Sequence, residues 1–448
     1  MPQRASDQVA FPERSGALAL GLVSIAVGAW TGAVVASFRL GLAAADRWRD
    51  ALLAVSHRWS GIGLVSAACA CAGAAAAASW LARRFSPYAE GSGIPEVEVA
   101  LLGELPPMPL PRLLLVKFVG GLLAIGGGLA LGPEGPSVQM GAVGARLLGR
   151  RFGCGWPDVR ALIAAGTGAG LAVAFNAPVA GAVFVLEELH RQFDRRQALA
   201  ALGASSTAIL VARLLLGEAP LFRVAASALA PVADAPASAA AAWPMYLALG
   251  VVAGICGAAY NRVLTGALEW AERTDRWPVR VQAPVVGALV GVIGWFAPHV
   301  IGAGETLTQG ILAGVVVVGA VPLTFVLRVL LGAACYGVRA PGGLFAPLLL
   351  LGAQVGLVFG GVCHWAFPAL GVHPHAFALI GMAAFFTGTV RTPVTGIVLV
   401  IEMTAAFTTI VPMLGATFAA LLAADLTGIP PIYDSLRGRL RDRLRAQE

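Results

Sequence analysis

The sequence has little charge and no long polar segment. Only 12% of its 448 residues are Asp, Glu, Lys or Arg, whereas about a quarter of the residues of a soluble domain are charged. Hydrophobic residues make up 58%, and the mean hydropathy is +0.79. A membrane-spanning helix needs about 20 mostly apolar residues, and runs of about that length or shorter follow one another along the chain. The low charge therefore excludes a soluble domain and predicts an all-α, multi-pass membrane protein.

The sequence also lacks the usual marks of secretion, metal binding and catalysis. The first sixteen residues contain no short apolar core with a cleavage site, so we expect no cleaved signal peptide. The six cysteines lie mostly in apolar runs without metal-ligand spacing, which is typical of small core residues. His373 and His375 have no carboxylate or cysteine beside them, and no catalytic Ser/His, HExxH or paired-Asp pattern occurs. We therefore expect no enzyme activity, metal or cofactor.

The net charge of +7 raises the possibility of nucleic-acid binding, but the basic residues gather in loops and near the C-terminus. The positive-inside rule explains this distribution better. It predicts that both termini are cytoplasmic and that the protein lies in a cell membrane, the inner membrane if the source is bacterial. Anionic lipid headgroups are the expected partners of the basic tail, whose arginines are Arg437, Arg439, Arg441, Arg443 and Arg445.

The apolar runs divide the chain into three parts. We expect a cytoplasmic segment (1–15), a membrane domain (16–428) and a short basic cytoplasmic tail (429–448), with no room for a cytosolic domain. The Ala/Pro-rich stretch 217–243 is too irregular for a span and is predicted to connect two halves, at about 16–216 and 244–428. We also expect the charged and aromatic residues 46–59 to lie at a membrane interface and to separate the first two spans. A single span is expected near 307–331.

An internal repeat relates the two halves. Residues 166–189 align without gaps on residues 381–404, with shared positions that include Pro178/Pro393, Gly181/Gly396 and Glu187/Glu402. A chance match of membrane sequence is the alternative, but a proline, a glycine and a glutamate in register favour duplication. Transporters built from repeats place their sites at the repeat interface, where broken helices point their N-termini at anions. Glu187, which has a mate, is predicted to be structural.

Three segments have glycine before a helix and proline in its first turn: 91–95 (GSGIP), 132–136 (GPEGP) and 343–347 (GLFAP). Proline is tolerated there because its missing N–H has no partner in the helix. The remaining N–H groups and the helix dipole favour an anion, and none of the segments contains a basic residue. Glu134 places an ionisable group within apolar sequence, which marks a functional site by default; a carboxylate that caps its own helix is the structural alternative.

These three motifs, in this order, resemble the signatures of the CLC family of chloride channels and proton/chloride exchangers, in a bacterial form without cytosolic CBS domains. The resemblance runs from the first long span to Tyr433. It implies two inverted structural repeats and a homodimer with a pore in each subunit. It also implies that Ser92 and Tyr433 donate hydroxyls to a central anion, while the backbone around it comes from Gly93, Ile94, Gly135, Leu344 and Phe345.

The resemblance further identifies Glu134 as the gating glutamate, which competes with the anion and leaves when protonated. Glu188 corresponds to the internal proton-transfer residue of the exchangers, although an ion pair with Arg191 or Arg195 is the structural alternative. Serine at position 92 accompanies chloride preference in the family, and N-capping is its structural alternative. Pro133 departs from the family pattern, which has Lys or Arg there, and is expected to weaken anion attraction without abolishing transport.

The sequence therefore predicts a coupled H+/Cl− exchanger in the lipid bilayer, with chloride and proton as its transported ligands and no nucleic acid as a partner. A passive voltage- or pH-gated chloride channel of the same fold is the nearest alternative. An exchanger for another small anion, such as nitrate, is a further one.

Overall fold

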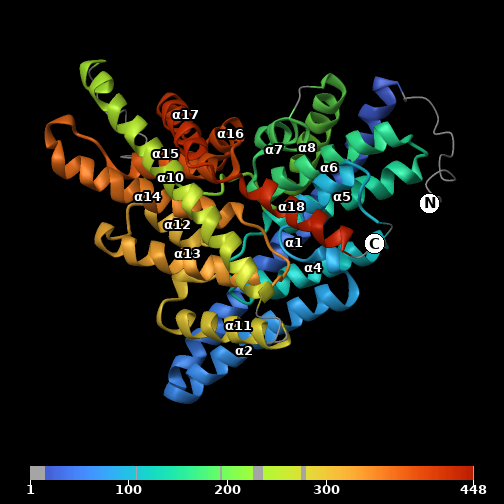
Figure 1. The fold of residues 1–448 in the computed structure, drawn as a ribbon, viewed down its shortest axis with the longest axis horizontal. Helices are drawn as coiled ribbons and strands as arrows, with labels where there is room; N and C mark the ends of the chain where they lie inside the picture. The colour runs from blue at the N-terminus through green and yellow to red at the C-terminus, as the bar shows by residue number, and fades with distance from the viewer. Residues whose placement is uncertain (1–15, 107, 192–193, 226–235, 274–278, 447–448) are drawn as a thin grey trace.

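The computed structural model describes residues 16–446 except 107, 192–193, 226–235 and 274–278, and the described residues form helices without β-strands (Figure 1). The predicted N-terminal segment 1–15 lies outside the described residues. The helices of the first half are α1 (Ala17–Ser56), α2 (Ser60–Phe85), α3 (Ile94–Leu101), α4 (Leu110–Gly126), α5 (Glu134–Arg151), α6 (Trp156–Phe175), α7 (Pro178–Phe184) and α8 (Arg195–Leu216). A π-helical turn, η3 (Val185–His190), continues α7.

The second half repeats this order of long and short helices. Its helices are α10 (Pro236–Arg273), α11 (Val279–Phe296), α12 (Glu305–Leu312), α13 (Val321–Gly337), α14 (Phe345–Ala366), α15 (Pro374–Val390), α16 (Pro393–Thr404) and α17 (Ile410–Leu426). The short helices α3 and α12 have 8 residues each, and α4 and α13 have 17 each. A last helix, α18 (Ile432–Arg445), lies near the centre of the view in Figure 1. The duplication predicted from the sequence is therefore present in the fold.

Small residues bring corresponding helix pairs of the two halves into close contact. Gly141 of α5 lies against Gly166 of α6, and Gly352 of α14 lies against Gly381 of α15. A methyl group at any of these positions would collide with the backbone of the facing helix. Inside a membrane, where lipid is as apolar as the side chains, such close approach is the main source of helix association.

Two glutamates join α7 and α16 at both ends of the pair. Glu187, in η3, accepts hydrogen bonds from the N–H groups of Val394 (3.0 Å) and Thr395 (2.7 Å) and from the Thr395 hydroxyl (2.7 Å) at the start of α16. Glu402, near the end of α16, accepts from two N–H groups at the start of α7, at 3.1 and 2.8 Å. Each carboxylate satisfies N–H groups that a helix leaves free. The structural role predicted for Glu187 is confirmed.

Three predicted boundaries differ from the structure. Helix α1 continues through Asp46 to Ser56, because residues 46–56 contain neither glycine nor proline to end it. The single span predicted at 307–331 is wrong: α12 ends at Leu312, Gly314 takes a left-handed conformation (φ +77°), and α13 begins only at Val321. Helix α10 begins at Pro236, within the predicted connector.

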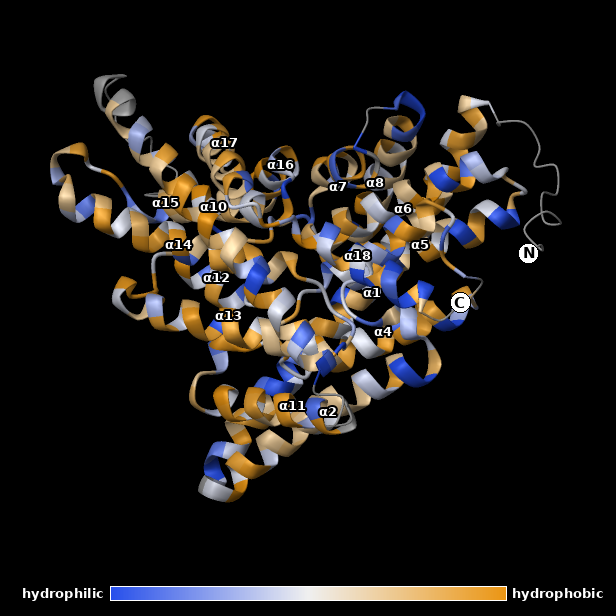
Figure 2. Ribbon diagram, viewed as in Figure 1, coloured by the Kyte–Doolittle hydropathy of each residue, from blue (hydrophilic) through white to orange (hydrophobic). Residues whose placement is uncertain are grey.

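Figure 2 shows hydrophobic residues along the helices at the edge of the molecule, such as α13, α14 and α17. Large apolar side chains on these helices are exposed, among them Leu323, Trp365 and Leu426. By length and composition, eight helices in the described part of the chain are able to cross a membrane, and three shorter apolar helices accompany them. The cysteines are unpaired, and Cys69 is exposed rather than part of the core as expected.

Candidate functional site

The structure brings the three predicted helix starts together through backbone hydrogen bonds. Gly132 and Gly343 exchange two of them, at 2.8 and 2.7 Å, and form an isolated antiparallel bridge. The N–H group of Gly342 donates to the carbonyl of Gly91 at 3.0 Å. The GPEGP and GLFAP segments are thus joined directly, and the GSGIP segment is joined to GLFAP. Helices α3, α5 and α14 therefore begin around one point at the interface of the two halves.

The carboxylate of Glu134 lies at this point. Glu134 is the first residue of α5 and is fully buried, and its Oε1 accepts a hydrogen bond of 2.5 Å from the N–H group of Phe345, the first residue of α14. A Cβ at Gly132 or Gly343 would collide with this carboxylate. Glycine is therefore required on both sides of it. The carboxylate does not only cap its own helix, since its hydrogen-bond donor belongs to the other half of the chain.

Two hydroxyl groups also lie unpartnered in this region. Ser92 and Tyr433 are buried, and Ser92 Oγ, Tyr433 Oη and Glu134 Oε2 have no hydrogen-bond partner among the described residues. The Ser92 hydroxyl lies close to that of Tyr433, and the charges of Glu134 and Glu188 act on the Tyr433 hydroxyl. Buried hydroxyls normally have partners, and these two are free to donate to an anion.

The other predicted backbone residues surround the same point. Gly93 caps α3 with a left-handed φ of +88°, and Ile94, the first residue of α3, is fully buried. Leu344, at the cap of α14, is also fully buried. Gly135 fits only as glycine, because a Cβ there would lie 2.5 Å from the carbonyl oxygen of Ser92. The structure thus places all the predicted anion-binding residues except Tyr433 on the three joined helix starts.

Phe345 is held by a cluster of aromatic rings. Its ring packs against Phe386 (4.7 Å between centroids), Phe184 (5.7 Å), Tyr433 (5.8 Å) and Phe175 (6.5 Å). These rings come from four other helices or turns, and Phe345 itself has no exposed surface. The cluster fixes the N-terminus of α14 and keeps its surroundings apolar, which strengthens electrostatic interactions with an anion there.

Sequence analysis missed two buried basic residues that support the helix starts. Lys117, in α4, is fully buried and donates to the carbonyls of Ala89 (3.1 Å) and Gly91 (2.8 Å). Arg328, at the matching position of α13, donates at 2.8 Å to the corresponding carbonyls before α12, those of Val300 and Gly302. Lys117 is the only lysine of the chain. That isolation within an apolar run was a signal that could have revealed its role.

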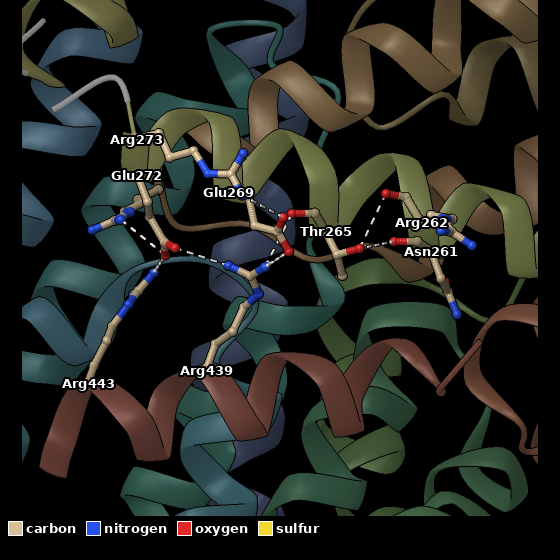
Figure 3. A network of polar contacts seen from close by, with 9 residues as sticks. Asn261, Arg262, Thr265, Glu269, Glu272, Arg273, Arg439 and Arg443 are labelled. Carbon is tan, nitrogen blue, oxygen red and sulfur yellow. Dashed lines mark hydrogen bonds and ion pairs between the residues drawn. The ribbon is translucent and has the colours of Figure 1, made fainter. Parts of the chain in front are cut away.

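Helix α18 carries Tyr433. It is held by ion pairs to α10 (Figure 3). Arg439 bonds Glu269 (2.6 Å) and Glu272 (3.0 Å) on α10, and Arg443 bonds Glu272 (2.6 Å). Arg437 and Arg441 pair with Glu98 (3.4 Å) and Glu104 (2.8 Å). These four guanidinium groups therefore pair with carboxylates of the protein and hold α18 against α10 and the region of α3.

Glu188 lies in the π-helical turn η3. It is 3% exposed, its Oε1 has no hydrogen-bond partner among the described residues, and its contact with Arg191 is long, at 3.8 Å. Arg191 bonds Asp434 instead, at 2.6 Å, and this hydrogen bond raises the pKa of the guanidinium. The predicted ion pair with Arg191 is thus present but weak. A π-turn is a frequent feature of functional sites, and here it places Glu187 and Glu188 in different surroundings.

Comparison with known proteins agrees with this architecture. Residues 73–425 match the profile of the voltage gated chloride channel family. The chain is 38% identical over 366 residues to the H(+)/Cl(−) exchange transporter ClcA of Vibrio cholerae, covering 80% of this chain and 76% of that protein. It is 35% identical over 435 residues to ClcA of Salmonella paratyphi B, covering 94% and 89%.

Among solved structures, a slow cyanobacterial Cl−/H+ antiporter superimposes with a TM-score of 0.88 at 31% identity, over 94% of this chain and 97% of that one. The joined helix starts, the duplicated helices and the sequence match all point to one conclusion, that this chain belongs to the voltage gated chloride channel (CLC) family.

Proposed function

We propose that the protein exchanges chloride for protons across a membrane and has no catalytic activity. The observation that carries this proposal is the position of the Glu134 carboxylate, which lies on the N-terminal N–H group of α14, where an anion would bind. The names of the similar proteins, H(+)/Cl(−) exchange transporters and a Cl−/H+ antiporter, support the same function.

The exchange follows from competition for one set of donors. A deprotonated Glu134 occupies the donors at the start of α14 and excludes chloride from them. Protonation removes its charge, so a chloride ion then binds these donors more strongly and the carboxyl group leaves. Ser92 and Tyr433 supply hydroxyl donors to the anion on the other side of Glu134. Each chloride that passes is therefore linked to a change in the protonation of Glu134.

Glu188 is the proposed internal proton-transfer residue, near α18. It is buried, it is only weakly paired with Arg191, and its charge reaches the Tyr433 hydroxyl, on which Glu134 also acts. Protons would pass between Glu188 and Glu134, while chloride passes Ser92 and Tyr433. We further propose a homodimer in the cell membrane with both termini, and therefore α18, on the cytoplasmic side.

A passive chloride channel of the same fold is the second candidate, and coupling separates the two. In liposomes with a chloride gradient, an exchanger shows a reversal potential that depends on the pH gradient. A purely Nernstian chloride potential without a response to pH would reject the exchanger and favour the channel. Nitrate in place of chloride, with the same measurement, tests the third possibility.

The decisive variant is Glu134→Ala. We expect it to carry chloride without proton movement and without dependence on pH, because the competing carboxylate is gone. Glu402→Ala is the matched control, since it removes a half-buried carboxylate that binds helix N–H groups away from the site. Proton coupling that persists in Glu134→Ala would contradict the proposed gate.

A further inference from the structure

A polar pocket lies beside Pro133, the residue before Glu134. Its volume is about 160 Å³, it lies between α1 and the start of α12, and Pro133 forms part of its wall. None of its lining residues comes from α3, α14 or α18, so it approaches Glu134 from a side that Ser92 and Tyr433 do not occupy. We call it the α1–α12 pocket. Its charged lining residues are Arg39, Asp46, Arg49 and Glu305.

Of the two guanidinium groups, only that of Arg39 has no carboxylate partner. Arg49 is neutralised by Asp46 (2.5 Å) and Asp50 (3.1 Å). Arg39 donates one hydrogen bond, to the carbonyl of Val173 at 3.0 Å, and makes no ion pair within 4.0 Å among the described residues. A backbone carbonyl does not cancel a unit charge. The positive charge of this half-buried side chain therefore acts on the pocket.

Glu305 lies across the pocket from α1. It is the first residue of α12, it is exposed, and its charge acts on both Arg39 and Glu134. A carboxylate there opposes the approach of an anion to Glu134, whereas Arg39 favours it. The two side chains thus have opposite effects on a chloride ion in the same pocket.

The internal repeat gives independent support for an anion path here. The start of α12 has the backbone geometry of the start of α3: left-handed glycine caps, Gly304 (φ +92°) and Gly93 (φ +88°), each followed by an eight-residue helix. The matching carbonyls before the two helices bind Arg328 and Lys117. The pocket is lined by the α12 counterpart of a segment that forms the proposed anion site.

We propose that the α1–α12 pocket is an access site for chloride, in which Arg39 provides the attracting charge and Glu305 the opposing one. This inference rests on the proposed chloride transport. Pro133 leaves the start of α5 without a basic residue, so the attraction comes from another helix. Charge at the mouth of a narrow site raises the local concentration of its ion, and this acts on substrate affinity more than on turnover.

The test is the initial rate of chloride transport in liposomes as a function of chloride concentration, at low ionic strength. Arg39→Gln keeps a donor for the Val173 carbonyl but removes the charge, and should raise the KM for chloride about fivefold with a smaller change in kcat. Arg39→Lys should restore the KM. Glu305→Gln should lower it. Both charge effects should shrink at about 0.3 M of an impermeant salt, where the Debye length is only several ångströms.

Arg58→Gln is the matched control, because Arg58 is exposed beyond the end of α1 and does not line the pocket. Adding Pro133→Arg to Arg39→Gln should lower the KM again. An unchanged KM in Arg39→Gln, or a loss of kcat alone, overturns the inference.

Two results separate the possible failures. If Arg39→Gln does not fold, Glu305→Gln and Pro133→Arg test the role of the pocket instead. Each must lower the KM for chloride when it is the only substitution in the protein. If the unchanged protein moves no chloride, the proposed function fails rather than the assignment of the pocket.

Discussion

Glu187 and Glu402 each bind the N-terminus of the facing helix, so replacing them should lower stability without abolishing transport. Glu402→Ala removes two hydrogen bonds to N–H groups at the start of α7, whereas Glu187→Ala removes three at the start of α16. Loss of an N-cap costs about 0.5–2 kcal/mol, and a hydrogen bond to a charged group contributes about 1.5–3 kcal/mol. Because both carboxylates are partly exposed, we expect losses of about 2 kcal/mol for Glu402→Ala and about 3 kcal/mol for Glu187→Ala.

Thermal unfolding in detergent measures these losses. The entropy of unfolding is about 2 cal/mol/K per residue, so in a chain of 448 residues the two variants should lower the Tm by about 2 and 3 °C. The double variant should approach the sum, because the caps lie at opposite ends of the helix pair. Proton-coupled transport should persist in both single variants.

Glu188→Ala is the control, since Glu188 follows Glu187 directly but makes no hydrogen bond among the described residues. The Tm of Glu188→Ala should fall by less than about 1 °C. It should rise if the carboxylate is charged in the native protein, because the variant removes a buried charge without a close partner. Its proton coupling should be lost. Equal Tm values for Glu187→Ala and Glu188→Ala, or loss of coupling in a folded Glu187→Ala, would refute the assignment of structural and functional roles.

Two further predictions concern the site and its support. Ser92→Ala and Tyr433→Phe each remove one hydroxyl donor and should weaken chloride binding, measured by calorimetry, about tenfold or more; unchanged affinity in both would exclude these hydroxyls from the anion site. Lys117→Met removes hydrogen bonds to two backbone carbonyls, and Arg328→Met removes hydrogen bonds to three, so each variant should lower the free energy of unfolding by about 3 kcal/mol, measured by thermal unfolding; a loss in only one would contradict their equivalence in the repeat.

Much of the fold was predictable because periodicity, glycine and proline act locally. The register that pairs Glu187 with Glu402 was visible in the sequence, and the structure explains it as mutual capping. The uninterrupted course of α1 through Asp46 was not predicted. Charges and aromatics are typical of a membrane interface, but in this helix Asp46 and Arg49 pair with each other one turn apart and do not break it.

The site was predictable only in part, because its contacts join segments that are distant in sequence. The motifs identified Glu134 and the three helix starts, yet nothing local shows that Glu134 accepts its hydrogen bond from Phe345, 211 residues away. The same holds for Arg39, whose neighbours in the pocket, Pro133 and Glu305, lie at the starts of α5 and α12. Such residues become visible only when the topology places them around one pocket.

The chemistry of this protein lies where the two halves differ. The supports are duplicated: Lys117 matches Arg328, and Glu187 matches Glu402. The groups proposed to act on chloride and protons are not. Where α5 begins with Glu134, α14 begins with Phe345, and the hydrogen bond between these two first residues crosses the interface of the repeats.

The other residues proposed to act on chloride and protons also lack an equivalent in the second half. Ser92 has Ala303 as its counterpart before α12, and Glu188 has Met403 as its counterpart on α16. If each half had a carboxylate at its helix start, two like charges would meet at a single point in an apolar interior, which is strongly unfavourable. A duplicated scaffold can therefore hold a glutamate gate only if one copy supplies the carboxylate and the other supplies the N–H group that binds it.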